Sequence, residues 1–551
     1  MTRISAAICA GALAVLALVA GATHSASAGT AEVKTYMVVF DGKTNADGSY
    51  AVESTYAVLC SYAVGGSYAV TGQYAVGCDY AVNGVYAVYA VASKYAVGLV
   101  GAAGGTVAAD LLKQTGTMVV QSANPAFAEA MRGYDGVDEV AEEHRWKAYP
   151  TLQEGLSSGR VTLQEACPPS DPQPGCPNPE PHADALEALQ WNMQRIQAPE
   201  AHAVQAGAPQ VEVGILDTGI DGVHLDFVDA GGPLFGGLNP LSNVNCEKGK
   251  DFVLLNGPGL GDPYPCRDNN FHGTHVAGIV GARANTLGVV GVAPNVELIP
   301  VKVCDTEGFC YASSTTAAIT YAGDMKFEVI NMSFFVDDNE FRESTQFKCM
   351  NDAQQRAFRK ANERAIQYAR KQGVTPVAAL GNSDTDLAHK PEPYEGNCEV
   401  VPAETQGVVG TMALGPENEK AYYSSYGSGA TDVAAPGGNP EFLEELCVDE
   451  VMSTIPGNAY GCFSGTSMAS PHTAGVAALI VSQFGKLGSD GDVQLSPTKV
   501  EQYLQSTTVD QGLPGYDECF GNGRINALRA VTRDTSGVYD ATAPFCEEYD
   551  D

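Results

Sequence analysis

Ser467 lies in the stretch of this 551-residue chain that is best suited to nucleophilic chemistry, GCFSGTSMASPH at residues 461–472. Glycines before the serine indicate a loop, and the apolar spacing of the following TAGVAALIVSQF indicates a helix. Free backbone N–H groups and the positive end of the helix dipole gather at such a junction. A serine there could attack a carbonyl carbon while its own N–H stabilises the resulting oxyanion. By itself the stretch is equally typical of a Ser/Thr-rich cap before a buried helix.

Two other polar residues stand where a base and an orienting carboxylate would be needed. Asp217 follows the apolar run 211–216, so we expect it at the carboxyl end of a buried strand, with an ordinary turn carboxylate as the alternative. His272 opens a small-residue helix in FHGTHVAG, and with His275 three residues later it could instead share a cation. Together with the serine they supply an orienter, a base and a nucleophile. The order Asp, His, Ser along the chain is one of the orders known for this geometry.

The elements that must position these residues have an α/β pattern. Short, nearly unalternating apolar runs predict strands buried on both faces, and they lie at 211–216, 298–303, 329–332, 374–380 and 408–413. Helical patterns fall between them, the clearest at 351–373, where alanines recur at every fourth position and a glycine ends the pattern. We therefore predict an α/β fold with a mostly parallel sheet flanked by helices. In that architecture sites form at the carboxyl ends of strands.

A smaller α+β unit is predicted upstream, with strands at 35–40 and 117–123 and helices at 108–116 and 125–134. A Tyr-Ala-Val repeat, mostly of period six, interrupts it at 50–97. In an extended chain an even period would place every tyrosine on one face, as in an adhesive module. The spacers between the copies share no turn chemistry, which favours a low-complexity expansion inserted into a loop.

Composition shifts divide the chain into five predicted segments. The first has an Arg, an apolar core and a small-x-small cleavage pattern, and a later stretch rich in Pro and Cys reads as a linker. The segments are a signal peptide at 1–28, the small unit at 29–150, the linker at 151–182, the main domain at 183–535 and an acidic tail at 536–551.

The charge of the chain restricts its partners. The formal net charge is −34 and the sequence pI is about 4.5, so nucleic acid and anionic membranes are poor partners. No apolar run after the signal is long enough to cross a bilayer. We expect a secreted, extracellular protein with no membrane attachment after signal removal.

The 15 cysteines include Cys9 in the signal, which leaves an even number for an oxidising compartment. We expect disulfides rather than a thiolate metal cluster, because no tight CxxC pair occurs. Close neighbours are the expected pairs: Cys167–Cys176, Cys246–Cys266, Cys304–Cys310, Cys349–Cys398 and Cys447–Cys462.

Three motifs now point to a family. DTGID at 217–221, HGTHVAG at 272–278 and GTSMASPH at 465–472 resemble the active-site blocks of the subtilisin-like serine proteases, the subtilases. The resemblance extends over roughly residues 184–530. It implies a serine endopeptidase that cleaves polypeptides with Asp217, His272 and Ser467 as its triad and needs no cofactor for catalysis. It also implies that residues 29–150 are an inhibitory prosegment, so that the protein is a self-processing zymogen and its own prosegment is a partner.

The resemblance carries further residues. In VAALGN, Asn382 is similar to the family's oxyanion asparagine. The expected substrate-binding residues are Ser333, Phe334, Phe335, Ala379, Leu380 and Gly381. Phe335 stands where the family often has glycine, and Asp337, Asp338 and Glu340 follow it. Narrowed subsites and a preference for basic residues both stay open, while a solvated acidic loop is the favoured interpretation.

A structural Ca²⁺ ion is a further expectation of the resemblance, with Asp226 and Asn285 as its ligands. The alternative is that Asp226 and Asn285 are polar residues of two ordinary surface turns and bind no ion. We expect a monomer. The competing hypothesis for the whole chain is a catalytically silent subtilase fold used for binding or adhesion.

Overall fold

The computed structural model describes residues 32–44, 50–52, 84–150, 160–161, 184–229, 242–256, 264–335, 347–349, 352–390, 398–440, 447–489 and 491–543. The predicted signal peptide, most copies of the repeat, most of the linker and the Cys167–Cys176 pair lie outside these residues. None of the described helices is long and apolar enough to cross a bilayer.

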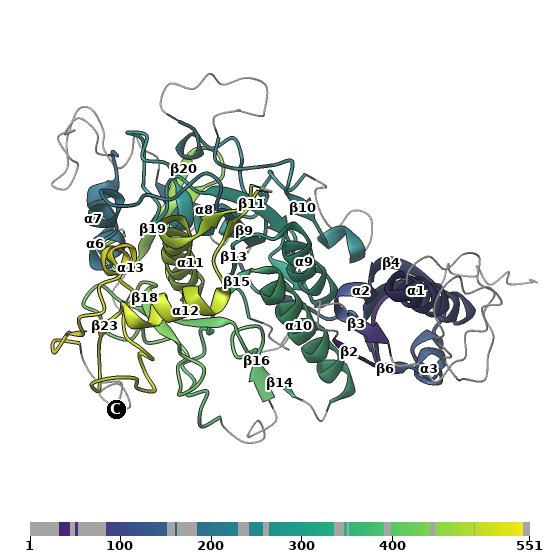
Figure 1. Ribbon diagram of the computed structural model, residues 1–551. Coiled ribbons are helices and arrows are strands. Elements are labelled where there is room, and N and C mark those ends of the chain that lie inside the picture. The colour runs from purple at the N-terminus through teal and green to yellow at the C-terminus, as the bar shows by residue number, and fades with distance from the viewer. Residues whose placement is uncertain are drawn as a thin grey trace, which may run out of the picture. The chain divides into compact units, whose positions relative to one another are not determined.

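Among the described residues, the main sheet has seven parallel strands (Figure 1). The apolar runs predicted five of them, and the two strands at the edges of the sheet were not predicted. Their order across the sheet is β10-β11-β9-β13-β15-β17-β18. The bounds are β9 Glu212–Asp217, β10 Lys250–Asp251, β11 Glu297–Lys302, β13 Val329–Met332, β15 Thr375–Ala379, β17 Val409–Leu414 and β18 Val433–Pro436. Strand β9 lies between β11 and β13, so the strand order reverses there, and in α/β sheets sites form at the carboxyl ends of strands beside such a reversal.

Helices cover both faces of this sheet. One core contains the buried sides of α8 (His272–Gly281), α11 (Thr466–Phe484), α12 (Pro497–Ser506) and α13 (Ala527–Thr532). The opposite core contains those of α9 (Ala312–Met325) and α10 (Ala353–Gln372). Helix α10 confirms the clearest helical prediction. Asp352 caps its first turn, and Gly373 ends it in the left-handed conformation that glycine adopts without strain.

The smaller unit is an antiparallel four-stranded sheet of order β4-β5-β1-β6 with its own core. Its strands are β1 Lys34–Phe40, β4 Gly105–Leu111, β5 Thr117–Ser122 and β6 Val137–Glu142, and its helices are α1 Gly84–Ala102, α2 Leu112–Thr115 and α3 Phe127–Arg132. The strands at 35–40 and 117–123 and the helix at 125–134 are confirmed.

Two details of the smaller unit differ from the sequence prediction. Residues 105–111 form β4, so the helix predicted at 108–116 shrinks to the four residues of α2. Pairing with β5 along its length outweighs the helical propensity of AADLLKQTG. The last copies of the repeat fall inside α1 rather than in a loop, because there the spacing shortens and the helix can bury Ala96, Leu99 and Val100 against the sheet.

The start of the main domain also differs. Residues 183–199 have a helical pattern in the sequence, but the structure divides this stretch into α6 (Trp191–Arg195) and α7 (Ala198–His202). The Gln190 side chain bonds both backbone groups of Val290, and Gln197 takes a left-handed φ of 54° just before α7. These tertiary contacts interrupt the helix.

Short strands complete the chain. Strands β19 (Val451–Ile455) and β20 (Ala459–Phe463) form a hairpin, and β8 (Arg160–Val161), inside the predicted linker, pairs with β20. Strand β24 (Val538–Tyr539), inside the predicted tail, pairs with β23 (Val509–Asp510). The remaining short strands among the described residues are β2 Gly42–Thr44, β3 Tyr50–Val52, β7 Arg145–Lys147, β12 Phe309–Tyr311, β14 Phe347–Cys349, β16 Cys398–Val400, β21 Lys486–Leu487 and β22 Val493–Gln494.

Three predicted disulfides are confirmed: Cys246–Cys266, Cys304–Cys310 and Cys447–Cys462. Cys398 is also disulfide-bonded, and the β14–β16 register places it opposite Cys349.

Candidate active site

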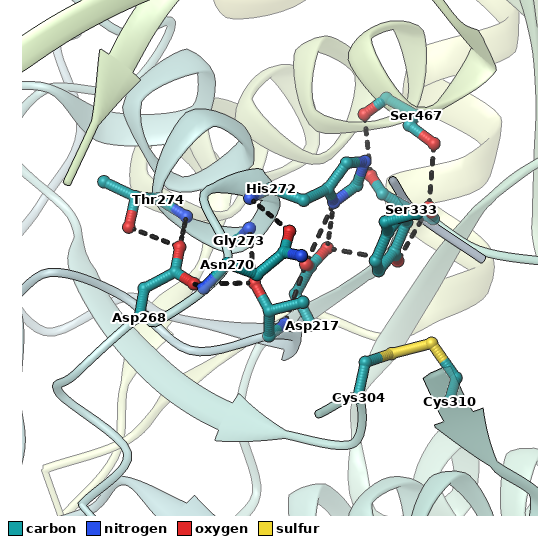
Figure 2. A network of polar contacts seen from close by, with 12 residues as sticks. Asp217, Asp268, Asn270, His272, Gly273, Thr274, Cys304, Cys310, Ser333 and Ser467 are labelled. Atoms are coloured by element: carbon teal, nitrogen blue, oxygen red, sulfur yellow. Dashed lines mark hydrogen bonds and ion pairs between the residues drawn. A yellow bond between two sulfur atoms is a disulfide. The ribbon is translucent and has the colours of Figure 1, made fainter. Parts of the chain in front are cut away.

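Asp217 and His272 form a buried pair at the carboxyl end of β9 (Figure 2). Asp217 is the last residue of β9 and fully buried, and His272 is the first residue of α8. The imidazole Nδ1 lies 2.9 and 3.0 Å from the two carboxylate oxygens. Because a carboxylate can only accept, Nδ1 carries the proton of the neutral ring and Nε2 keeps its lone pair.

Asp268 holds the two elements of this pair together, and the sequence analysis missed it. Its buried carboxylate accepts hydrogen bonds from the Thr218 hydroxyl at 3.0 Å and from the Thr274 N–H and hydroxyl at 2.9 and 2.7 Å. The Thr218 hydroxyl in turn accepts the Gly273 N–H at 2.9 Å. Thr218, which follows Asp217, and Gly273, which follows His272, are therefore both held in place by the Asp268 carboxylate, Gly273 through the Thr218 hydroxyl. The Asp-Asn-Asn run just before the helix was the available sequence signal, since such residues cap helices.

Ser467 is the second residue of α11, as the loop-to-helix pattern predicted. Its hydroxyl donates to the Ser333 carbonyl at 2.9 Å, and the Ser333 hydroxyl donates to the Ser467 carbonyl at 2.8 Å (Figure 2). Within the described residues no hydrogen bond joins Ser467 to His272. The nucleophile candidate and the base candidate thus share one site, but the serine hydroxyl is engaged elsewhere.

Tyr149 contacts His272 and lines a cavity together with Ser467. Its ring stacks on the His272 imidazole, with centroids 3.6 Å apart, and its hydroxyl lies 3.4 Å from Asp217 Oδ2 and 3.1 Å from the Ser333 carbonyl oxygen. Burial and the neighbouring Asp217 carboxylate raise the pKa of the phenol well above its usual value, so it stays a hydrogen-bond donor. Tyr149 and Ser467 therefore donate to the same carbonyl.

Asn382 follows β15 and faces the loop before Ser467. Its amide oxygen accepts the Thr466 N–H at 2.9 Å and the Thr466 hydroxyl at 2.8 Å. Its amide nitrogen lies on the side of Gly465, where a Cβ atom would stand 3.4 Å from that nitrogen and 3.6 Å from the Ser467 N atom. Both potential oxyanion donors are thus close to the nucleophile candidate.

The sequence matches the model of the subtilase family, Peptidase_S8, over residues 209–523, which is more than half of the chain. The chain belongs to the subtilase family. The protein is accordingly a serine-type endopeptidase, a hydrolase that acts on polypeptides and, like other subtilases, needs no catalytic cofactor.

Individual relatives agree with this subtilase assignment. The chain is 31% identical to M-protease of Shouchella clausii over 422 residues, which cover 75% of this chain and 89% of the relative. It is 32% identical to Subtilisin BL of Lederbergia lenta over 347 residues, 63% of this chain and 100% of the relative. The epidermin leader peptide processing serine protease of Staphylococcus aureus shares the fold, with a TM-score of 0.61, 18% identity and coverage of 91% of this chain and 98% of that one.

The expected substrate residues of this subtilase fall into two groups. A cavity of about 60 Å³ is lined by Ser333, Phe334, Phe335 and Ser467 on one side and by residues 146–149 on the other. Ala379 and Leu380 are fully buried in the sheet, and the Gly381 N–H donates to the Thr466 hydroxyl at 3.1 Å. The second group does not line this cavity. It precedes Asn382 in the chain and, through the Gly381 N–H, holds the Thr466 hydroxyl in place.

The expected calcium residues Asp226 and Asn285 lie close together, because the Asn285 side chain bonds the carbonyls of Leu225 and Val228. Asp226 is fully buried, and its Oδ2 accepts the Val289 N–H at 2.8 Å. The Tyr460 hydroxyl lies beside this carboxylate, but Oδ1 has no hydrogen-bond partner of normal geometry among the described residues. The Asn285 amide nitrogen donates to the Leu225 and Val228 carbonyls, and its amide oxygen accepts the Leu287 N–H.

A second carboxylate lies near this position. Asp184 accepts the Asn285 N–H at 3.0 Å. Burial raises the pKa of Asp184 to about 7, and burial together with the Asp184 charge raises that of Asp226 to about 7. An orphaned buried carboxylate oxygen beside another carboxylate fits a hard cation. The Asn285 amide oxygen already accepts the Leu287 N–H, so it is less available as a calcium ligand than the sequence motif predicted.

Replacing Asp268 should damage the site without removing any reacting group. We expect Asp268→Ala to lower the free energy of unfolding by about 2 kcal/mol or more, because several buried donors lose their acceptor. The kcat on a peptide substrate should fall more than KM changes, since β9 and α8 lose their tie. Urea unfolding and steady-state kinetics measure both. Asp268→Asn, which keeps one acceptor oxygen, should lie between; wild-type stability in Asp268→Ala would contradict the role.

Proposed function

We propose that this subtilase cleaves peptide bonds with Ser467 as nucleophile, His272 as general base and Asp217 as the residue that orients and stabilises the imidazole. The observation that carries the proposal is the buried Asp217–His272 pair, with Nδ1 2.9 Å from the carboxylate, at the site where Ser467 begins α11. Its fixed tautomer leaves Nε2 available to take the serine proton.

The chemical steps then follow from the positions of the donors. The Ser467 hydroxyl turns from the Ser333 carbonyl to His272 Nε2, gives up its proton and attacks the scissile carbonyl. The Ser467 N–H, which stands in the first turn of α11 without an intrahelical acceptor, and the Asn382 amide nitrogen stabilise the oxyanion. His272 next protonates the leaving amine, and a water activated by the same ring releases the acyl group.

We further propose that the chain is an exported zymogen. Residues 1–28 direct secretion to the extracellular space, and residues 29–150 inhibit the enzyme until the chain is cut. Support comes from Tyr149, which covers His272 and bonds the Ser333 carbonyl that Ser467 also uses. An extended substrate cannot enter while residues 145–149 occupy this position. The mature enzyme acts as a monomer.

Intact mass and fluorophosphonate labelling of the wild type beside Ser467→Ala test the function. The wild type should lose its N-terminal segment and take up the label, while Ser467→Ala stays full-length and unlabelled. Ser464→Ala, three residues earlier, should behave like the wild type. A wild type that stays full-length by itself, and that takes up no label even after an added protease has removed the N-terminal segment, would favour the competing hypothesis of a silent binding or adhesive protein.

We also propose a structural Ca²⁺ ion held by Asp226 with Asp184, next to the Asn285 loop. Millimolar CaCl₂ should raise the Tm above that in EDTA by roughly 5 °C, because a ligand that binds only the folded state stabilises it by mass action. Asp226→Asn should abolish the difference, whereas Asp229→Asn should keep it. An equal Tm of the wild type with CaCl₂ and with EDTA would rule the site out.

A further inference from the structure

Residues 145–149 show how an extended polypeptide approaches Ser467. Strand β7 (Arg145–Lys147) pairs antiparallel with β12 (Phe309–Tyr311), and the two form a separate two-stranded sheet. The Ala148 and Tyr149 N–H groups then donate to the Gly308 carbonyl at 2.9 and 3.2 Å. A substrate that reaches Ser467 along this edge has to make the same backbone contacts, and its side chains then meet the same neighbours.

The side chains of β7 alternate between two environments. Trp146 is buried, opposite Cys310, with its ring centroid 6.2 Å from those of Phe334 and Phe358. Arg145 and Lys147 point to the other face and are exposed. The segment therefore presents an aromatic side chain inward and two cations outward.

Both cations lie over one ring. The Arg145 guanidinium carbon is 4.8 Å and the Lys147 Nζ 6.0 Å from the centroid of Phe309. Lys147 stands directly opposite Phe309 in the ladder, and Arg145 is its diagonal neighbour. Aromatic faces attract cations within about 6 Å. In a chain with only 31 Lys and Arg residues against 65 Asp and Glu, two cations on one ring are a specific arrangement.

The loop before Phe309 is held rigid, so the ring is in place before any ligand arrives. The Cys304–Cys310 disulfide closes the loop, and Asp305 accepts the Glu307 and Phe309 N–H groups, each at 3.0 Å. Gly308 has a φ of +83°, and a Cβ atom there would stand 2.2 Å from the Tyr149 carbonyl oxygen. The chain therefore approaches this loop as closely as a glycine allows.

We propose that Phe309 determines substrate specificity by binding cationic side chains at the two positions that Arg145 and Lys147 occupy here. These lie four and two residues before the residue in the place of Tyr149. The substrate class is thus an extended cationic segment with a large aromatic residue between two basic ones. The inference rests on the proposed function and extends it to the substrate.

Matched peptides test this on processed, active-site-titrated enzyme. The parent peptide is Arg-Trp-Lys-Ala-Tyr with a C-terminal fluorogenic group, and its partner carries citrulline, a neutral arginine isostere, in place of Arg. We expect the wild type to favour the Arg peptide in kcat/KM by roughly 2- to 5-fold. Phe309→Tyr should keep this ratio, and Phe309→Leu should reduce it to the residual attraction of the acidic surface, which 0.5 M NaCl screens.

The same arginine-to-citrulline ratio in the wild type and in Phe309→Leu would overturn the proposal. A second measurement does not depend on catalysis. In full-length Ser467→Ala protein, Phe309→Leu and Arg145→Gln should each speed amide exchange in β7, and the double variant should add little to either. If the wild type takes no label but this coupling is present, the proposed function fails while the cation site stands. If the effects of Phe309→Leu and Arg145→Gln on amide exchange simply add in the double variant, Phe309 and Arg145 do not stabilise β7 through their mutual contact. The proposed binding of cations by Phe309 is then wrong.

Discussion

The Asp217–His272 contact is the interaction on which the rest of the site depends. A fully buried carboxylate is costly unless its charge is paired and its oxygens accept hydrogen bonds. Here the imidazole and the Thr218 N–H supply those bonds, and Asp268 fixes the backbone on both sides. Strand β9 lies where the strand order reverses, and the start of α8 meets the carboxyl end of that strand through the contact of His272 with Asp217. The parallel sheet thus creates the site by its topology.

The N-terminal segment occupies this site through ordinary sheet and aromatic contacts. Strand β7 pairs with β12, so backbone groups of β7 form hydrogen bonds in the way that those of an extended substrate would. Tyr149 then adds a ring stack on His272 and hydroxyl contacts to two polar groups of the site. Because the segment is part of the same chain, it competes with substrate at a high effective concentration. In the zymogen that we propose, inhibition by the prosegment and recognition of the substrate use the same surface.

Local sequence patterns correctly predicted several secondary-structure elements and the positions of the candidate catalytic residues on them. The strand-end Asp217, the helix-start His272 and the loop-to-helix Ser467 were all placed on the right elements, as were the parallel sheet and α10. Tyr149 could not be found this way, because its contacts are made across 68 and 184 residues. The helical end of the Tyr-Ala-Val repeat was missed because burial against the small sheet decides its conformation.

Fluorophosphonate labelling of unprocessed full-length chains measures most directly whether residues 145–149 hold this active site closed. The compared chains are the wild type, Tyr149→Phe and Tyr149→Ala, with the initial labelling rate at Ser467 read by intact mass. Loss of the ring stack and the hydroxyl contacts should make Tyr149→Ala react roughly tenfold or more faster than the wild type, with Tyr149→Phe between them. Equal rates in all three chains would contradict a site blocked by Tyr149.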